Sequence, residues 1–290
     1  IHMEGTVFKI ALAVLFLPLT LFAQTIETDI TQTCFGRTVE RPWPFCLTKP
    51  KVRQSPDILY FIHGANDNEK TWFEDYRDIR DAWRARGKAM PTVISFTFAP
   101  VWLTVFKNGY KTSGLLQWIP EQMMPWLEAQ VGGLGQGGHR MILSKSMGGF
   151  NATQFAFHYP KLFSRVAMIS PAILQHTPFD LKALPEFIKR TGATKTKAFW
   201  TSVLFRSFFP TAEVWAKTAP YYAGADQLNA KTPELYISAG DKDTWGFFEG
   251  AKHFAERAKA NGVRKVVWDL IPGGTHHEYD ADSVAEFLEP

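Results

Sequence analysis

Cysteine is scarce in this chain of 290 residues, which contains only Cys34 and Cys46. Neither cysteine stands near a histidine in the sequence, so neither is a candidate for a catalytic thiol. Both follow closely on an apolar leader, and in an oxidising compartment they would pair and hold the proline-rich stretch 41–44 in place. Two unrelated thiols are the alternative that the sequence leaves open.

An excess of charge of one sign is also missing. The formal net charge is +4, Lys and Arg do not cluster into a run, and aromatic residues are not interleaved with them. Proteins that bind nucleic acid carry a clustered basic surface, so no nucleic-acid partner is predicted. The chain also shows no internal repeat and no low-complexity linker, which indicates one large domain.

The amino-terminal apolar run, Ile10–Ala23, is shorter than the ~20 residues that a transmembrane helix needs. With Lys9 before it and a small residue at its end, it is typical of a secretory signal peptide, predicted over residues 1–23 with cleavage after the last of them. Ile1 and His2, before the first methionine, are interpreted as a cloning remnant. The predicted location is therefore secreted or periplasmic, with no stable membrane insertion after leader removal. An uncleaved anchor is the alternative.

A serine stands between an apolar strand and a helix in the middle of the chain. The predicted strand Met141–Leu143 leads to Ser146, and a predicted helix follows over residues 150–159. Such a turn is a nucleophile elbow, which exposes the serine Oγ above the sheet and places it at a helix amino terminus, where developing negative charge is stabilised. Gly148 provides the small residue that the close approach of strand and helix requires. A Ser/Gly-rich loop after a strand is the alternative.

A nucleophilic serine needs a base and an acid, which follow it here in the order Ser, Asp, His. Asp243 stands in the loop after a predicted strand over residues 234–239, with Asp241 as the alternative acid. His276 stands in the loop after the last predicted strand, with His277 as the alternative base. Zinc ligation by the two histidines is disfavoured because adjacent side chains diverge and no other ligand cluster accompanies them.

Two backbone N–H groups are candidates for an oxyanion hole. The predicted strand 58–62 ends in His63-Gly64-Ala65, and a strand that ends in this way upstream of a serine elbow is typical of the loop that supplies one donor. We expect the N–H groups of Ala65 and Met147 to face the developing oxyanion. The side chain of His63 is expected to hydrogen-bond neighbouring loops.

Aromatic residues mark two candidate substrate surfaces. The stretch after the predicted strand 92–98 carries Trp102, Phe106 and Trp118, which are predicted to line an acyl or alcohol pocket, with plain packing as the alternative. Residues 172–229 are irregular and rich in aromatics, which is typical of a helical cap over an active site. Helices packed at the sheet edge are the alternative for that segment.

The chain resembles the α/β-hydrolase family, in particular its esterase D-like branch, over most of residues 55–290. The resemblance rests on six short stretches: His63-Gly64, Ser144–Gly149, Tyr159-Pro160 with Phe163, Ser170-Pro171, Gly240–Asp243 and Gly273–His276. It implies an α/β-hydrolase fold, with a mostly parallel central sheet flanked by helices and the cap-like insertion at 172–229. Residues 24–54 would form an amino-terminal segment before the domain at 55–290. Ser144 in place of glycine and the charged Lys145 depart from the family pattern.

The resemblance implies a secreted serine carboxylesterase that acts through an acyl-enzyme intermediate. Its Ser-His-Asp triad would be Ser146, His276 and Asp243, with no metal and no other cofactor. The expected partner is a small-molecule or carbohydrate-linked ester. An acyltransferase or a peptidase on the same triad, or a non-catalytic binding protein of the same fold, are the alternatives. The natural ester, its acyl chain length and the oligomeric state are not indicated by the sequence.

Overall fold

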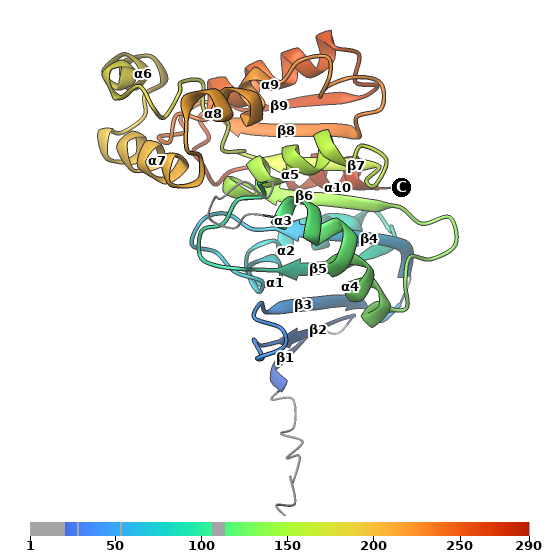
Figure 1. Cartoon of the computed structure of the whole chain (residues 1–290). Helices are drawn as coiled ribbons and strands as arrows, with labels where there is room; N and C mark the ends of the chain where they lie inside the picture. Colours follow the sequence, from blue (N-terminus) through green and yellow to red (C-terminus); the bar gives the residue numbers. More distant parts are fainter. Residues whose placement is uncertain (1–20, 28, 53, 106–113, 290) are drawn as a thin grey trace, which may run out of the picture.

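A nine-stranded sheet in the order β1-β2-β3-β5-β4-β6-β7-β8-β9 forms the centre of the computed structural model (Figure 1), which describes residues 21–27, 29–52, 54–105 and 114–289. β1, β2, β3 and β5 pair in antiparallel fashion, whereas β4 to β9 run parallel. The strands are β1 (Leu21–Glu27), β2 (Ile30–Phe35), β3 (Phe45–Pro50), β4 (Gln54–Ile62), β5 (Met90–Phe96), β6 (Arg140–Lys145), β7 (Arg165–Ile169), β8 (Glu234–Gly240) and β9 (Val266–Ile271).

Helices cover both faces of the sheet (Figure 1), and each face has its own apolar core. The larger core lies under α4, α5 and α9, and the smaller one lies under α1, α2 and α10. The helices are α1 (Thr71–Asp75), α2 (Arg77–Ala85), α3 (Leu115–Trp118), η1 (Ile119–Met123), α4 (Met124–Val131), α5 (Met147–His158), η2 (Leu181–Ala183), α6 (Leu184–Thr191), α7 (Lys195–Phe208), α8 (Ala212–Thr218), η3 (Pro220–Tyr222), α9 (Phe248–Ala260) and α10 (Ala281–Leu288).

The predicted α/β fold class, with a mostly parallel sheet flanked by helices, is confirmed. Apolar runs of three to seven residues form the largely buried strands β4 to β8, as expected for strands covered on both faces, whereas the edge strand β9 is only partly buried. The stretch from residue 71 to 85 forms two helices, α1 and α2. The chain breaks at Tyr76, whose φ of −114° and ψ of 37° are not helical. The apolar residues Trp72, Ile79 and Trp83 of the two helices are buried.

The amino-terminal segment and the carboxyl-terminal helix were not predicted as regular structure. β2 shows alternating burial along its length, as an edge region covered on one face does. Its inward positions are mostly polar or small, which hid the period of two in the sequence. α10 packs Val284, Phe287 and Leu288 into the smaller core. The apolar face of α10 is short, and the sequence contains no apolar run there that would predict a helix.

Cys34 and Cys46 face each other across β2 and β3 and form a disulfide. The bond closes a loop with a sequence separation of 12 residues, which includes the proline-rich turn, as the sequence predicted. The cross-link restricts the unfolded chain, and the two sulfur atoms are buried at the antiparallel end of the sheet.

Removing the disulfide is expected to destabilise the fold without removing the site. A loop of this length predicts a loss of about 3 kcal/mol in the free energy of unfolding for Cys34→Ser/Cys46→Ser, or roughly 5 °C in Tm. Thermal unfolding followed by circular dichroism measures the shift. Reductant should lower the Tm of the wild type and leave that of the double variant unchanged. Equal Tm values for the wild type and the variant would contradict a stabilising role.

The predicted leader lies almost wholly outside the described residues, which begin at Leu21. The cleavage site expected after Ala23 falls inside β1, which pairs with β2. Within the described part of the chain, we find no helix with the length and hydrophobicity needed to cross a bilayer.

The segment predicted as a cap, residues 172–229, contains α6, α7 and α8. In Figure 1, α6 and α7 project beyond the end of the sheet at which β6 and β8 finish. Because ligands of parallel α/β sheets bind at the carboxyl ends of the strands, this position puts the helices over the expected site.

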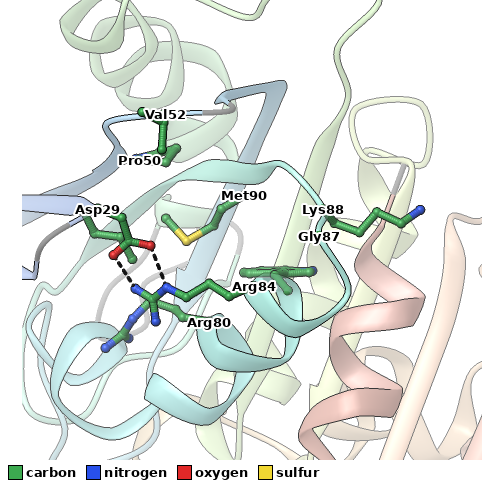
Figure 2. A pocket seen from close by; sticks show the side chains of 10 residues that line it. Asp29, Pro50, Val52, Arg80, Arg84, Gly87, Lys88 and Met90 are labelled. Carbon is green, nitrogen blue, oxygen red and sulfur yellow. Dashed lines mark hydrogen bonds and ion pairs between the residues drawn. The ribbon is translucent and has the colours of Figure 1, made fainter.

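A cavity of about 240 Å³ lies between α2 and the antiparallel strands (Figure 2). Arg84 of α2 donates through Nε and Nη2 to the two carboxylate oxygens of Asp29, at 2.6 and 2.9 Å. This hydrogen bonding, with the nearby positive charge, lowers the pKa of Asp29. The pair joins the turn before β2 to a helix of the main domain, so we assign this cavity a structural role.

Candidate active site

Ser146 occupies a sharp turn between β6 and α5. Its φ of 52° and ψ of −116° are rare for a residue with a side chain, as expected at a nucleophile elbow. The turn is held from both sides: the Ser146 N–H donates to the Ile169 carbonyl at 3.0 Å, and the Ser146 carbonyl accepts from the Ala172 N–H at 2.8 Å. β7 and the segment after it therefore fix the conformation that presents the serine.

Glycines permit the close approach of strand and helix at this turn. A Cβ on Gly148 would lie 2.0 Å from the Ile62 carbonyl oxygen, and one on Gly149 would lie 2.4 Å from Cβ of Pro171. Ser144, where the family pattern has glycine, is fully buried and donates through Oγ to the Ala167 carbonyl at 3.1 Å. The departure is accommodated because the hydroxyl finds a partner within the sheet.

The structure brings Asp243 and His276 together. Nδ1 of His276 lies 2.8 Å from Oδ2 of Asp243, and both side chains are buried. The second carboxylate oxygen, Oδ1, accepts from the Trp245 N–H at 2.8 Å. With both oxygens engaged, the carboxylate is fixed in orientation. A proton on Nδ1 facing Asp243 leaves the Nε2 lone pair of a neutral imidazole available.

The two alternative residues are engaged elsewhere. Asp241 is exposed and accepts from the Gly273 N–H at 2.8 Å, so it ties the loop after β8 to the loop after β9. The Lys242 N–H donates to the Gly274 carbonyl at 2.8 Å and joins the same two loops. Nδ1 of His277 accepts from Nζ of Lys145 at 3.0 Å. Partial burial, and then the positive charge of Lys145, lower the pKa of His277.

The loop after β4 passes directly beside the nucleophile. A Cβ on Gly64 would lie 3.5 Å from Cβ of Ser146, and Ala65 lines the same pocket as Ser146 and Met147. Asn66, with a φ of 66°, donates its N–H to the Pro100 carbonyl at 2.7 Å and so fixes the turn. The backbone at Ala65 thus borders the pocket at the place where one oxyanion donor was predicted.

His63 supports this loop with its side chain, as predicted from the sequence. Its Nδ1 lies 2.7 Å from the Gly64 carbonyl, and its Nε2 accepts from the Trp102 indole N–H at 3.2 Å. Thr97 Oγ1 is 2.7 Å from the same Nε2. Burial lowers the pKa of His63, which favours the neutral ring that these contacts require.

Ser146, His276 and Met147 share the wall of one pocket with a volume of about 140 Å³. Two of its sides come from α7 and from the loop that carries Asp243. The apolar lining residues are Leu103, Ala172, Leu204, Phe205, Trp245 and Phe247. The rings of Trp245 and Phe247 also flank the His276 imidazole, at centroid distances of 5.8 and 5.6 Å.

The aromatic residues predicted to line the pocket from residues 102–118 do not do so where the structure describes them. Trp102 is fully buried behind the pocket wall, where its backbone N–H donates to the Met147 sulfur at 3.3 Å. Trp118 packs its ring against Trp43, with a centroid distance of 5.9 Å. Phe106 lies outside the described residues.

Trp245 and Phe247 are pocket residues that the sequence analysis missed. They could have been predicted from their closeness in sequence to Asp243, because residues of one short loop after a strand lie at the same edge of the sheet. Thr201, Leu204 and Phe205 belong to the predicted cap, but their inward direction depends on how α7 packs. Among the described residues, no group of three or more His, Cys, Asp or Glu side chains is arranged to hold a metal ion.

The sequence of residues 45–288 matches the family Esterase, described as "Putative esterase". Curated protein sequences contain no match to the chain.

Solved esterase structures share the fold at low sequence identity. An S-formylglutathione hydrolase from Agrobacterium tumefaciens superposes with a TM-score of 0.62 at 15% identity, over 92% of this chain and 95% of the other. A ferulic acid esterase superposes with a TM-score of 0.59 at 17% identity, over 90% and 94%. A brefeldin A esterase, a bacterial homologue of human hormone-sensitive lipase, superposes with a TM-score of 0.60 at 19% identity, over 92% of this chain and 75% of the other.

Proposed function

We propose, from the premise that this chain belongs to the Esterase family of ester-hydrolysing enzymes, that it is a serine carboxylesterase with Ser146 as its nucleophile. One observation carries the proposal. A buried imidazole, hydrogen-bonded to a buried carboxylate at 2.8 Å, stands on the wall of the pocket that also contains the serine of the strained turn. Ser146 and His276, 130 positions apart in the sequence, line this pocket, and Asp243 holds the imidazole from behind, which supports the roles that acyl transfer requires.

In the first step, Ser146 Oγ attacks the ester carbonyl carbon while Nε2 of His276 takes the hydroxyl proton. Asp243 holds the ring with Nδ1–H directed at its Oδ2, so that Nε2 is the basic nitrogen. The carboxylate also stabilises the imidazolium that forms. Collapse of the tetrahedral intermediate transfers the proton from His276 to the leaving alcohol and leaves an acyl group on Ser146.

In the second step, water enters and His276 removes its proton as the water oxygen attacks the acyl carbonyl. The second tetrahedral intermediate collapses to the free acid and returns the proton to Ser146 Oγ. Both intermediates carry negative charge on the former carbonyl oxygen. The backbone N–H groups of Ala65 and Met147 are the proposed donors to it, and one such donor is worth about 3 kcal/mol in other serine hydrolases.

The pocket favours esters with a small apolar group. Its volume of about 140 Å³ is close to that of the ~150 Å³ engineered cavity that holds one benzene molecule. The lining is mostly apolar, so an acyl or alcohol part of the size of a short alkyl chain or one aromatic ring fits best. The proposed substrates are therefore small carboxylic esters, free or attached to a carbohydrate.

We further propose that the enzyme works outside the cytoplasm, in the periplasm or secreted. The Cys34–Cys46 disulfide supports this location, because structural disulfides persist in oxidising compartments. The predicted leader over residues 1–23 is the second support.

Covalent labelling tests the proposed nucleophile. A fluorophosphonate should add one phosphonyl group per chain, and peptide mapping by mass spectrometry should place it on Ser146. Heat-unfolded protein is the control, because labelling requires the folded base. Absence of labelling in folded protein, or labelling of another serine, would contradict the proposal.

Product analysis separates the hydrolase from its rivals on the same triad. With a p-nitrophenyl ester and added alcohol or sugar acceptors, the expected main product is the free acid. A predominance of the transferred ester would identify an acyltransferase. Cleavage of peptide substrates at comparable rates would identify a peptidase.

A further inference from the structure

The outer face of the cap helix α7 is apolar and exposed. Phe199, Trp200 and Val203 expose 45%, 60% and 37% of their surface. Since an α-helix has 3.6 residues per turn, Lys195, Phe199, Val203 and Arg206 form one stripe, with Trp200 beside it. The two rings are adjacent, with centroids 5.8 Å apart. The stripe therefore presents two aromatic rings to solvent with a cation at each end.

The opposite face of α7 already satisfies the packing of the helix. Ala198, Ser202, Phe205 and Phe208 are buried there, and the Phe205 ring lies 4.9 Å from the Trp215 ring. The core therefore does not require apolar residues on the outer face. A helix that is apolar on both faces normally has both of them covered. An exposed aromatic cluster of this kind is typical of an interaction surface.

The same part of the chain carries a concentration of positive charge. Residues 181–207 contain six Lys or Arg residues and one carboxylate, Glu186, a local net charge of +5 in a chain whose total is +4. Lys195 and Arg206 lie on the apolar stripe itself, and both are exposed. This stretch of the cap is thus cationic, whereas the rest of the molecule has a net charge close to zero.

We propose that this outer face of α7 docks on an anionic lipid surface, with the rings of Phe199 and Trp200 at the level of the headgroups. Aromatic rings favour that interface, and long Lys and Arg side chains reach back to anionic headgroups. A second copy of the chain is a poorer occupant. A symmetric pair would place the same cluster of cations against itself.

Docking would also orient the active-site pocket. Thr201, Leu204 and Phe205 belong to the same helix and line the pocket of Ser146. α7 is therefore a wall between the lipid surface and the pocket, so docking holds the pocket within one helix diameter of the membrane. This orientation rests on the proposed function, whereas binding to lipid does not.

Co-sedimentation with vesicles tests the proposal. The full chain should bind phosphatidylcholine vesicles that contain 30% phosphatidylglycerol, bind pure phosphatidylcholine vesicles at least tenfold more weakly, and lose affinity as salt is raised. Phe199→Ser/Trp200→Ser should weaken binding to the anionic vesicles at least tenfold. Lys195→Gln/Arg206→Gln should weaken it about fivefold for each charge removed.

Val39→Ser/Val52→Ser is the matched control, because it removes two exposed apolar side chains, 96% and 66% exposed, from the other end of the sheet. This control variant should bind vesicles as the wild type does. Ser146→Ala should also bind like the wild type, because it removes the proposed nucleophile but leaves the outer face of α7 unchanged. Unaltered binding by Phe199→Ser/Trp200→Ser, equal binding to neutral vesicles, or no binding to anionic vesicles would overturn the proposal. So would a concentration-dependent dimer in light scattering that the Phe199→Ser/Trp200→Ser variant abolishes.

Discussion

Ser146→Ala is expected to lower kcat for a short p-nitrophenyl ester by roughly 10⁵- to 10⁶-fold. Loss of the serine of a triad has an effect of this size because the remaining groups cannot form the acyl-enzyme. The substitution removes the hydroxyl of a partly buried residue and none of the backbone hydrogen bonds that hold the turn. Initial rates, measured with protein checked for host esterase contamination, give the change. The Tm should stay within a few degrees of the wild type.

Ser144→Ala is the matched control for this experiment, two positions earlier and within β6. It also removes a single hydroxyl, one that donates to the Ala167 carbonyl inside the sheet. Its expected cost is about 1 kcal/mol in the free energy of unfolding, with kcat within a few-fold of the wild type. Full activity in Ser146→Ala would rule out the proposed nucleophile. A large loss of kcat in Ser144→Ala but not in Ser146→Ala would indicate that activity depends on the conformation of the turn and not on the Ser146 hydroxyl.

His276→Gln is expected to reduce kcat to nearly the same extent as Ser146→Ala, because without the base the serine hydroxyl is a weak nucleophile. Glutamine is close in size and can still hydrogen-bond to Asp243, so the fold of the loop is expected to survive. The variant should also react with a fluorophosphonate far more slowly than the wild type. Time courses of labelling measure this directly.

His277→Gln provides the comparison, since the two histidines are neighbours in sequence but differ in surroundings. His277 is exposed and accepts from Lys145, whereas His276 is buried against Asp243. We expect His277→Gln to keep kcat within about tenfold of the wild type. If the two effects were exchanged, His277 would be the base and the Asp243–His276 pair would be structural.

The proposed catalytic groups could be predicted from the sequence because each stands at a strand end. Buried parallel strands are short apolar runs that are visible in the sequence, and their order along the chain places the loops that follow them at one edge of the sheet. Ser146, Asp243 and His276 each follow such a run. The sequence already favoured Asp243 over Asp241, and the contacts of the two residues support that choice, because Asp243 lies against His276 whereas Asp241 accepts from Gly273.

The pocket wall could not be predicted in the same way. Trp102 and Trp118 were chosen for their position after a strand, but the direction of a side chain in a loop depends on contacts distant in sequence. Trp102 turns inward toward His63, and Trp118 turns toward Trp43 of the antiparallel end. Trp245 and Phe247 reach the pocket because the carboxylate of Asp243 accepts from the Trp245 backbone. Which aromatic residues line the pocket is therefore decided by tertiary packing, which the composition of the loops does not reveal.

The linkage between the loops after β8 and β9 has a consequence for heat inactivation. Asp241 and Lys242 bind the backbone of Gly273 and Gly274, and a Cβ on Gly240 would lie 2.1 Å from the Gly274 carbonyl oxygen. The loops that carry the proposed acid, Asp243, and the proposed base, His276, are thus joined to each other by hydrogen bonds. Aligning the two side chains when substrate arrives needs no separate ordering step. On heating, we expect Asp243 and His276 to lose their alignment in one step, when the two joined loops unfold.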